Sequence, residues 1–410
     1  MLCENYLKPL FLSKPVIAEL GKADPTGGYK LQSFQEPSVE TLVLVPSERC
    51  NLCCTYCYEQ HKHSQRMDIQ TAKVAVRSAF SNLGPCKRLK IEFRGGEPFL
   101  EFDFIKEVCD WVIKEYPAGL FSFYAITNGT CFSDEVKQWL LRHKERFVVA
   151  LSIDGDRTTQ NRNRSDSFDL IDFDFLFETW TRPCCVTTIL PENSLTVFRD
   201  LRFVMDKGFD VRVNFGYVQE WSFVQLAQLA RGFKRFADYA LGKRYANRIN
   251  LLSRYNFLDY SFVQDEAEPE RRRHFLACNA GKYRRLVAAD GKAYPCQAFV
   301  PSAFNWCSGS AAGNLFDKLK TEELHPSKCC TCRFFYLCHI CPGFSYGYAG
   351  SFRWRNPSLC AVTKIRTFLA SYYWGNRMRN RTNRAAMGSD NAKMTMSAIA
   401  ALYHGEKIYE

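Results

Sequence analysis

Residues 47–59 read SERCNLCCTYCYE, and they follow the short apolar run Thr41–Val45. Cys50, Cys54 and Cys57 have three and then two residues between them. Three thiolates on one loop can hold three irons of a [4Fe–4S] cluster and leave the fourth iron open to another ligand. A structural zinc site would be closed by four ligands, which this loop does not supply at such a spacing. The stretch therefore predicts an iron–sulfur cluster with one open position.

The composition of the chain favours a globular protein of the cytoplasm. Its 410 residues are 46% hydrophobic and 24% charged, with a net charge of +12. No stretch approaches the roughly 20 apolar residues of a transmembrane helix, and no secretory signal opens the chain. In a reducing compartment the nineteen cysteines are not expected to form disulfides. Because four of them lie at positions 50–57 and eight at 296–360, we expect two groups of metal ligands.

From residue 41 onward, β-rich apolar runs alternate with helical patterns, which predicts βα units around a parallel sheet. Helices are expected after Asp68 as N-cap, from Asp103, after Ser133, and from about Asn193 to just before Gly208. Six such units suit a partial (β/α)6 barrel, whose active site would lie at the C-terminal ends of the strands. The expected strands are Thr41–Val45, Leu89–Phe93, Ser122–Thr127, Phe147–Ile153, Cys184–Leu190 and Val211–Tyr217.

The rest of the chain differs from the barrel in composition. An Asp290-Gly291 pair between two short β-rich runs predicts a hairpin that aims Cys296 inward. The basic run Arg377–Arg384 is expected to be a solvated face or tail. The expected divisions are an N-terminal extension (1–40), the barrel (41–220), a helical bridge (221–277), a small cysteine-rich domain (278–365) and a C-terminal helical segment and tail (366–410).

The first cysteine spacing, with an aromatic residue before the last cysteine, resembles the signature of the radical S-adenosylmethionine (SAM) superfamily. The segment Gly95-Gly96-Glu97-Pro98 supports the resemblance, because that family has Gly-Gly-Glu-Pro at the end of its second strand. The resemblance implies that the methionine amine and carboxylate of SAM chelate the open iron. Glu97 would suit the methionine ammonium, and the glycines would let the backbone approach the cofactor.

Two further strand ends resemble family positions near the ribose and the methionine carboxylate. They are Thr127-Asn128-Gly129 and Ser152-Ile153-Asp154-Gly155, although Asn-Gly and Asp-Gly pairs are also common in ordinary turns. Arg162 and Arg164 are nearby cations for the same carboxylate. On this resemblance the predicted cofactor-binding residues are Tyr56, Gly95, Gly96, Glu97, Asn128, Ser152 and Arg164.

The second cysteine group resembles the SPASM extension of radical SAM enzymes, and this resemblance implies two auxiliary [4Fe–4S] clusters, three clusters in all. The family usually has three residues between its last close pair of cysteines, whereas this chain has two between Cys338 and Cys341. The implied ligands are Cys329, Cys332, Cys338 and Cys360 for the distal cluster, and Cys278, Cys296 and Cys341 for the nearer one.

Some alternatives for these cysteines stay open. The nearer cluster either keeps an open iron or is completed by another group such as Cys307. Two Cys-x2-Cys pairs could instead form one closed zinc site, which would leave Cys278, Cys296 and Cys360 unexplained. Cys53 and the Cys184-Cys185 pair are expected to pack as small hydrophobic residues, and Cys330, the neighbour of Cys329, is not expected to be a ligand.

The SPASM resemblance implies a reaction on a peptide. A reductant of the flavodoxin or ferredoxin type would supply one electron, SAM would yield a 5′-deoxyadenosyl radical, and this radical would abstract a side-chain hydrogen atom. The leading hypothesis is an oxidative crosslink at the β carbon of a ribosomally made precursor peptide. No general base stands out, and Asp154 and Glu220 are the candidates. Only about 40 residues precede the first strand, so a separate protein, the bridge or the C-terminal helices would recognise a leader peptide.

Two other functions remain as alternatives. Sulfatase maturases, which form formylglycine, have an aspartate directly after the cysteine that matches Cys296, whereas this chain has Gln297, which cannot take a proton. An iron–sulfur protein that modifies or binds nucleic acid would use the basic run Arg377–Arg384 on phosphates. No recognisable nucleic-acid module accompanies that run, so nucleic acid is the less favoured partner, and no membrane partner is expected.

Overall fold

A computed structural model describes most of the barrel and parts of the cysteine-rich region. The described residues are 4–11, 39–59, 65–83, 88–217, 219–243, 249, 280–281, 283–300, 321–330, 332, 334, 338 and 341–379. Cys278 and Cys307, most of the expected bridge and residues 380–384 of the basic run lie outside them. No helix in this described part is long and apolar enough to cross a membrane.

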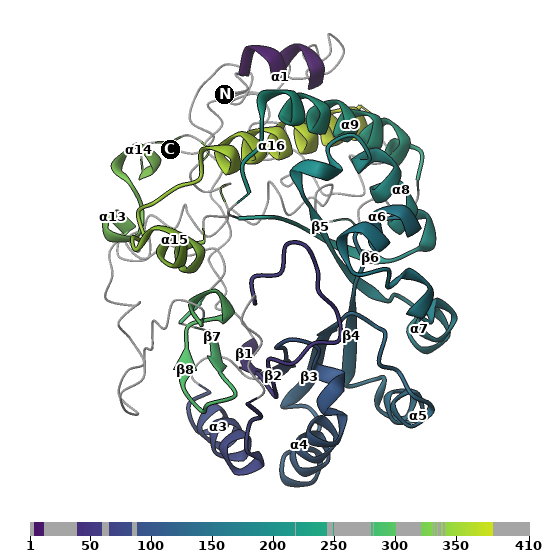
Figure 1. The fold of residues 1–410 in the computed structure, drawn as a ribbon, viewed down its shortest axis with the longest axis vertical. Coiled ribbons are helices and arrows are strands. Elements are labelled where there is room, and N and C mark those ends of the chain that lie inside the picture. Colours follow the sequence, from purple (N-terminus) through teal and green to yellow (C-terminus); the bar gives the residue numbers. More distant parts are fainter. Residues whose placement is uncertain are drawn as a thin grey trace.

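A curved sheet of eight strands forms the centre of the molecule, in the order β6-β5-β4-β3-β2-β1-β7-β8 (Figure 1). Strands β1 to β6 pair in parallel with their neighbours, which confirms the six parallel strands expected of a partial barrel. The strands are β1 Val39–Leu44, β2 Arg88–Phe93, β3 Phe121–Thr127, β4 Phe147–Ser152, β5 Cys184–Ile189, β6 Asp210–Phe215, β7 Arg284–Val287 and β8 Ala293–Tyr294.

Capping residues set the ends of the barrel helices. Asp68 accepts hydrogen bonds from the backbone N–H groups of Gln70 (2.9 Å) and Thr71 (3.1 Å). Ser133 is likewise the N-cap of the helix Asp134–His143. Gly208 ends the helix Val197–Lys207 and adopts the left-handed conformation, with φ 95°. The helices that follow strands are α3 Ile69–Ser81, α4 Phe102–Glu115, α5 Asp134–His143, α6 Arg157–Asn163, α7 Phe173–Thr179, α8 Val197–Lys207 and α9 Phe223–Leu241.

The crossover from β4 to β5 contains two short helices, α6 and α7, which the sequence did not predict. Each begins at an aspartate N-cap, Asp156 or Asp172, whose side chain accepts a backbone N–H. Neither is long enough to show a helical period in the sequence, because each has only seven residues. The described residues also include four short 3₁₀ turns, at Pro98–Glu101, Phe168–Leu170, Pro191–Asn193 and Gln297–Phe299.

The two faces of the sheet differ in polarity. The large apolar core lies on the face covered by helices and takes alternate strand residues such as Phe93, Phe123 and Val149. The opposite, concave face has a small apolar patch around Tyr124 and charged groups beside it. Lys90 and Arg212 both lie over the Tyr124 ring, at 5.2 and 5.7 Å from its centre. The inside of the barrel is therefore partly polar, as a site for a polar ligand needs.

The predicted hairpin forms at Asp290-Gly291, with Gly291 at φ +80° and β8 antiparallel to β7. The sequence did not predict that β7 would join the barrel sheet beside β1, where Leu286 packs near Val43. This pairing covers the edge that β1 would otherwise present to solvent. It also places Cys296, two residues after β8, next to the barrel.

The C-terminal helix α16 (Pro357–Met378) connects the cysteine-rich region to the barrel. It packs against α9 and α1 (Glu4–Phe11), as Figure 1 shows. The amide of Asn356 donates hydrogen bonds to the carbonyl oxygens of Tyr217 (3.1 Å) and Gln219 (2.8 Å), just after β6. The remaining helices of this region are α13 Thr321–Leu324, α14 Ser327–Cys330 and α15 Pro342–Ala349.

Candidate cluster and cofactor site

Two glycines seat the loop that carries Cys50, Cys54 and Cys57. A Cβ atom on Gly96 would lie 2.1 Å from the carbonyl oxygen of Arg49, and one on Gly95 would lie 2.2 Å from that of Ser47. The backbone N–H of Gly96 donates to the carbonyl oxygen of Ser47 at 3.2 Å, and that of Glu97 donates to the carbonyl oxygen of Arg49 at 2.8 Å. The glycines thus let the end of β2 press directly against the loop ahead of Cys50.

The ends of β3 and β4 hold the other side of the loop. The amide of Asn128 donates to Asn51 Oδ1 at 2.9 Å, and Asn51 in turn donates to Thr130. After β4, the carbonyl oxygen of Asn163 accepts the N–H of Thr55 at 3.0 Å. Four consecutive strand ends therefore converge on the cysteine loop, where the sequence predicted an active site.

Glu97 ties two of these strand ends together. Its side chain is 1% exposed and accepts hydrogen bonds from Thr127 Oγ1 (2.6 Å), the backbone N–H of Asn128 (2.7 Å) and that of Phe99 (3.1 Å). Burial raises the pKa of this carboxyl to about 7, although the three hydrogen bonds act in the opposite direction. The carboxylate thus joins β2 to β3 directly, and its contact with the methionine ammonium stays a prediction.

A buried ion pair between Asp154 and Arg164 supports the cysteine loop. Asp154, which is 1% exposed, lies 3.1 Å from Arg164 Nε and accepts hydrogen bonds from Tyr56 Oη (2.7 Å) and Asn163 Nδ2 (3.2 Å). Burial alone would lower the pKa of Arg164, but the adjacent Asp154 carboxylate raises it above its ordinary value. Burial and the same carboxylate also raise the pKa of the Tyr56 phenol.

This network corrects the role suggested for Asp154. A general base must reach the proton that it takes, whereas both oxygens of Asp154 are occupied by protein donors, including the backbone N–H of Thr188 at 3.0 Å. Asp154 therefore positions Tyr56 and the cysteine loop. Glu220, the other candidate, is exposed after the C-terminal end of β6.

The donor set at this loop fits an iron–sulfur cluster. Cys50, Cys54 and Cys57 are each half-buried on one loop, and Arg164 lies close enough for the Cys54 thiolate to raise its pKa. Within the described ranges, no three His, Cys, Asp or Glu side chains converge as closely as a single metal ion requires. A cluster instead presents its irons at separate points, so its thiolates need not meet at one centre. The predicted residues Asn128, Ser152 and Arg164 are all buried around this loop.

The four predicted ligands of the distal cluster lie near one another. Cys329 is on α14, Cys332 follows it, Cys338 precedes α15, and Cys360 lies in the first turn of α16. Burial, together with the neighbouring thiolates of Cys360, Cys329 and Cys332, raises the pKa of Cys338 to about 12. Burial and neighbouring thiolates likewise raise the pKa values of Cys329 and Cys360. These four thiols would repel one another once they are deprotonated, and the positive charge of an iron core would remove that repulsion.

The nearer set is partly described. Cys341 is the N-cap of α15, and Cys296 precedes the 3₁₀ turn Gln297–Phe299. These two elements pack closely, since a Cβ atom on Gly343 would lie 2.8 Å from the Cβ of Ala298. Cys341 and Cys296 are therefore carried by adjacent elements, which agrees with their assignment to one cluster.

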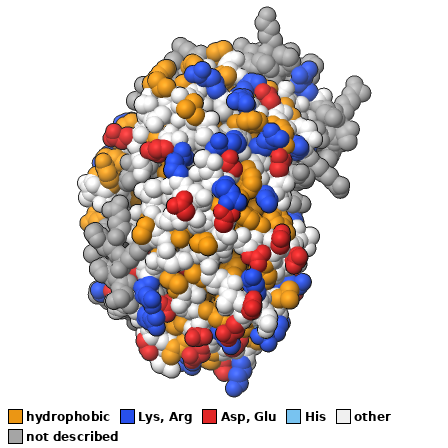
Figure 2. Space-filling model, turned by 45° about the vertical axis from the view of Figure 1, so that its right-hand side comes forward, with side chains coloured by type: hydrophobic (Ala, Val, Ile, Leu, Met, Phe, Trp, Pro, Cys, Tyr) orange, Lys and Arg blue, Asp and Glu red, His pale blue; other side chains and the backbone are white. Residues whose placement is uncertain are grey.

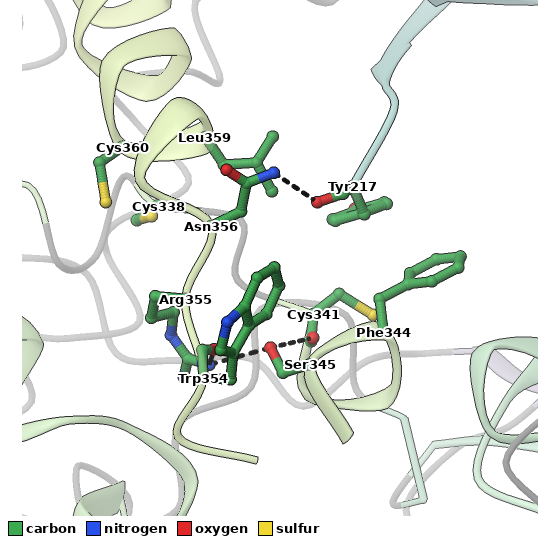
Figure 3. Close-up of a pocket in the computed structure, with 10 residues that line it drawn as sticks. All are labelled: Tyr217, Cys338, Cys341, Phe344, Ser345, Trp354, Arg355, Asn356, Leu359 and Cys360. Carbon is green, nitrogen blue, oxygen red and sulfur yellow. Dashed lines mark hydrogen bonds between the residues drawn. The ribbon is translucent and has the colours of Figure 1, made fainter. Parts of the chain in front are cut away.

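Sequence reasoning missed Arg355, which lines a cavity together with Cys338, Cys341 and Cys360 (Figure 3). Arg355 lies two residues before α16 and belongs to no recognisable motif. One of its hydrogen-bond partners, Leu324, lies much earlier in the sequence. No local pattern in the sequence could have identified it.

Comparison with known proteins agrees with this site. A family model described as a 4Fe-4S single cluster domain matches residues 40–170. A cysteine-type anaerobic sulfatase-maturating enzyme of Clostridium novyi is 24% identical over 338 residues, which are 73% of this chain and 87% of that protein. An uncharacterized protein of Methanocaldococcus jannaschii is 30% identical over 160 residues, so the chain spans only 54% of that relative.

Solved structures of the same fold include two that contain peptides. The enzyme anSMEcpe with bound AdoMet and the Cp18Cys peptide gives a TM-score of 0.65 at 16% identity, over 84% of this chain and 99% of that one. Streptococcus suis SuiB bound to its precursor peptide SuiA gives a TM-score of 0.53 at 17% identity, over 84% of this chain and 79% of that one. At these identities the likeness concerns the fold, a partial barrel followed by a cysteine-rich region.

Proposed function

Because the chain is a radical SAM enzyme related to the SPASM-containing, peptide-modifying members of that family, we propose that it oxidises a side chain of a ribosomally made precursor peptide and forms a crosslink there. The attacked atom in this proposal is a β carbon. The observation that carries the proposal is that Cys329, Cys332, Cys338 and Cys360 lie near one another, beside a barrel that already has its own three-cysteine loop.

Each residue group has a distinct part in the proposed reaction. Cys50, Cys54 and Cys57 would hold the first cluster, which together with SAM supplies a carbon radical able to remove a hydrogen atom. The contacts of Gly96, Asn51 and Tyr56 fix that loop over the concave face of the sheet. A peptide side chain held on this face would meet the reactive carbon at near-attack distance, roughly 3–3.5 Å.

The second cysteine region would take the electron that the oxidation releases. When a peptide loses two hydrogen atoms to form one bond, the 5′-deoxyadenosyl radical takes one of them. The other leaves as a proton, which passes to water, and an electron, for which an acceptor is needed; auxiliary clusters are such acceptors. Asn356 and α16 tie this region to the end of β6, so its position relative to the barrel is fixed. This argument supports three [4Fe–4S] clusters, with Cys278, Cys296 and Cys341 as the remaining ligands.

Formylglycine formation is the second candidate, and the Clostridium novyi relative favours it. Gln297 argues against it, because an amide cannot act as the base that a carboxylate would supply after Cys296. The Oε1 atom of Gln297 is buried and makes no hydrogen bond within the described part of the chain.

A nucleic-acid function finds little support in the described part of the basic run. Arg377 donates a hydrogen bond to Tyr373 Oη at 2.8 Å and lies over the Trp374 ring. Acidic side chains also lie among the basic ones across the face shown in Figure 2.

Anaerobic reconstitution followed by incubation with SAM, a reductant and peptides encoded beside the gene tests the proposal. We expect about twelve irons per chain, 5′-deoxyadenosine, and a peptide that is lighter by two hydrogen atoms with its sulfur retained. A product in which an aldehyde replaces a thiol would instead establish the maturase function. Zinc in the cysteine-rich region, or no 5′-deoxyadenosine from iron-loaded protein, would refute the assignment.

A further inference from the structure

The side chain of Arg355 lies in a cavity between α15 and the start of α16 (Figure 3). Cys338, Cys341 and Cys360 line the same cavity, and Ser345 and Trp354 close it. The thiols of Cys338 and Cys360 belong to the set expected to hold the distal auxiliary cluster. A cation thus stands within the cysteine group and not on its solvent side.

Both terminal nitrogens of Arg355 are fixed by the protein. One donates hydrogen bonds to the carbonyl oxygens of Phe352 and Trp354, both at 2.6 Å. The other donates to the carbonyl oxygen of Leu324 at 2.6 Å and lies 2.6 Å from His325 Nδ1. The guanidinium plane therefore has one orientation, set by backbone atoms from two separate segments.

The third donor of the guanidinium is different. The Nε atom is buried and makes no hydrogen bond of ordinary geometry within the described residues, while the Cys329 thiol lies near the guanidinium. A buried donor without a partner costs about 1–3 kcal/mol, and more when it is charged. Three thiols, those of Cys338, Cys341 and Cys360, line the cavity that holds this donor.

We propose that Arg355 is a positioning residue whose Nε–H donates a hydrogen bond to a sulfur of the distal auxiliary cluster held by Cys329, Cys332, Cys338 and Cys360. This inference rests on the proposed presence of that cluster. A hydrogen bond and a fixed positive charge both favour the reduced cluster, which carries one more negative charge. Arg355 therefore raises the reduction potential of the distal cluster and makes it a better acceptor of the electron from the substrate.

The first test measures the midpoint potential of the auxiliary clusters by a redox titration followed with electron paramagnetic resonance. The full chain carries Cys50→Ala, Cys54→Ala and Cys57→Ala, so that only auxiliary clusters contribute. We expect Arg355→Gln to retain its iron and to show at least a tenfold smaller equilibrium constant for one-electron reduction, a fall of about 59 mV. The matched control is Arg353→Gln, because Arg353 is exposed and contacts Ser327 at its far end.

Unchanged potentials in an iron-loaded Arg355→Gln variant would overturn the inference. If iron counting and metal analysis show zinc, or no cluster beyond the first in the unsubstituted chain, the proposed auxiliary clusters fail instead, and the two failures are thus distinguishable. A charge-retaining variant, Arg355→Lys, should show a smaller fall than Arg355→Gln, since it keeps the charge and loses the Nε–H.

The deciding result of a second measurement comes from the unsubstituted chain, whatever iron the variants load. In protein that carries ¹⁵N-labelled arginine, pulsed electron paramagnetic resonance of the reduced auxiliary clusters should detect a coupled arginine nitrogen. The signal should persist in Arg353→Gln and disappear in Arg355→Lys. Its absence from the unsubstituted, cluster-loaded protein would show that Arg355 serves only to hold α13 and α15 against the segment ahead of α16.

Discussion

Replacement of Gly96 by alanine should displace the cluster loop. The added Cβ would lie 2.1 Å from the carbonyl oxygen of Arg49 and 2.4 Å from that of Glu48, and both atoms are backbone, which cannot rotate away. Relieving such overpacking costs about 1–3 kcal/mol. A shift of the loop also weakens the hydrogen bonds of Gly96 and Glu97 to Ser47 and Arg49, each contributing about 0.5–1.5 kcal/mol.

Together these terms amount to about 2–6 kcal/mol, which corresponds to a population of the native loop position that is roughly thirtyfold smaller or more. Gly96→Ala should therefore lose the iron of the first cluster after reconstitution and form little 5′-deoxyadenosine. Iron counting, together with circular dichroism to show that the sheet is intact, measures this. The control is Gly119→Ala, where an added Cβ meets no atom within 4 Å. Full iron loading and undiminished 5′-deoxyadenosine in Gly96→Ala would refute the role given to this glycine.

Three further predictions concern the buried groups. Asp154→Asn should lower the free energy of unfolding by about 3–5 kcal/mol, because it leaves a buried arginine unpaired. The control Asp169→Asn, in an exposed ion pair, should lower it by only about 0–1 kcal/mol. Equal urea midpoints for the two variants would contradict the positioning role of Asp154. The pKa of Glu97 rises from 4.5 unfolded to about 7 folded, so the folded state binds more protons in this interval. Stability should fall as pH rises through this interval, by about 3 kcal/mol in total, and urea titrations of Glu97→Gln should lack that slope. Cys338→Ala should lose about four irons and Cys330→Ala none, and equal losses would contradict the ligand assignment.

The sequence predicted the barrel strands closely because each is a compact apolar run bounded by turns and helical patterns. Observed β3, Phe121–Thr127, begins one residue earlier than expected, and β5 ends one residue earlier. The pairing of β7 with β1 could not be predicted from the sequence, because it joins segments about 240 residues apart and neither segment alone specifies a parallel partner. Short capped helices such as α6 were missed because seven residues cannot display a helical period.

Parts of the site escaped prediction for a different reason, namely that burial is not visible in a motif. Asp154 and Glu97 occupy positions typical of cofactor contacts, yet both are 1% exposed and bonded to neighbouring strand ends. The cysteine spacing, in contrast, was informative, since a thiolate ligand needs few other features to be recognised. Arg355 combines contacts from Leu324 to Phe352, so its environment exists only in the folded chain.

The contacts around the first cysteine loop have a consequence for how the first cluster is acquired. Gly96, after β2, packs closely against the loop. Asn128, after β3, donates a hydrogen bond to the loop, and Tyr56 of the loop donates one to Asp154, after β4. A loop held from three sides loses little conformational entropy when it takes up a ligand, because the ordering has already occurred on folding. The three thiols are thus presented by a preorganised loop. A cluster bound to these thiols would be held by that rigidity at one place above the concave face, as a reaction that depends on near-attack geometry requires.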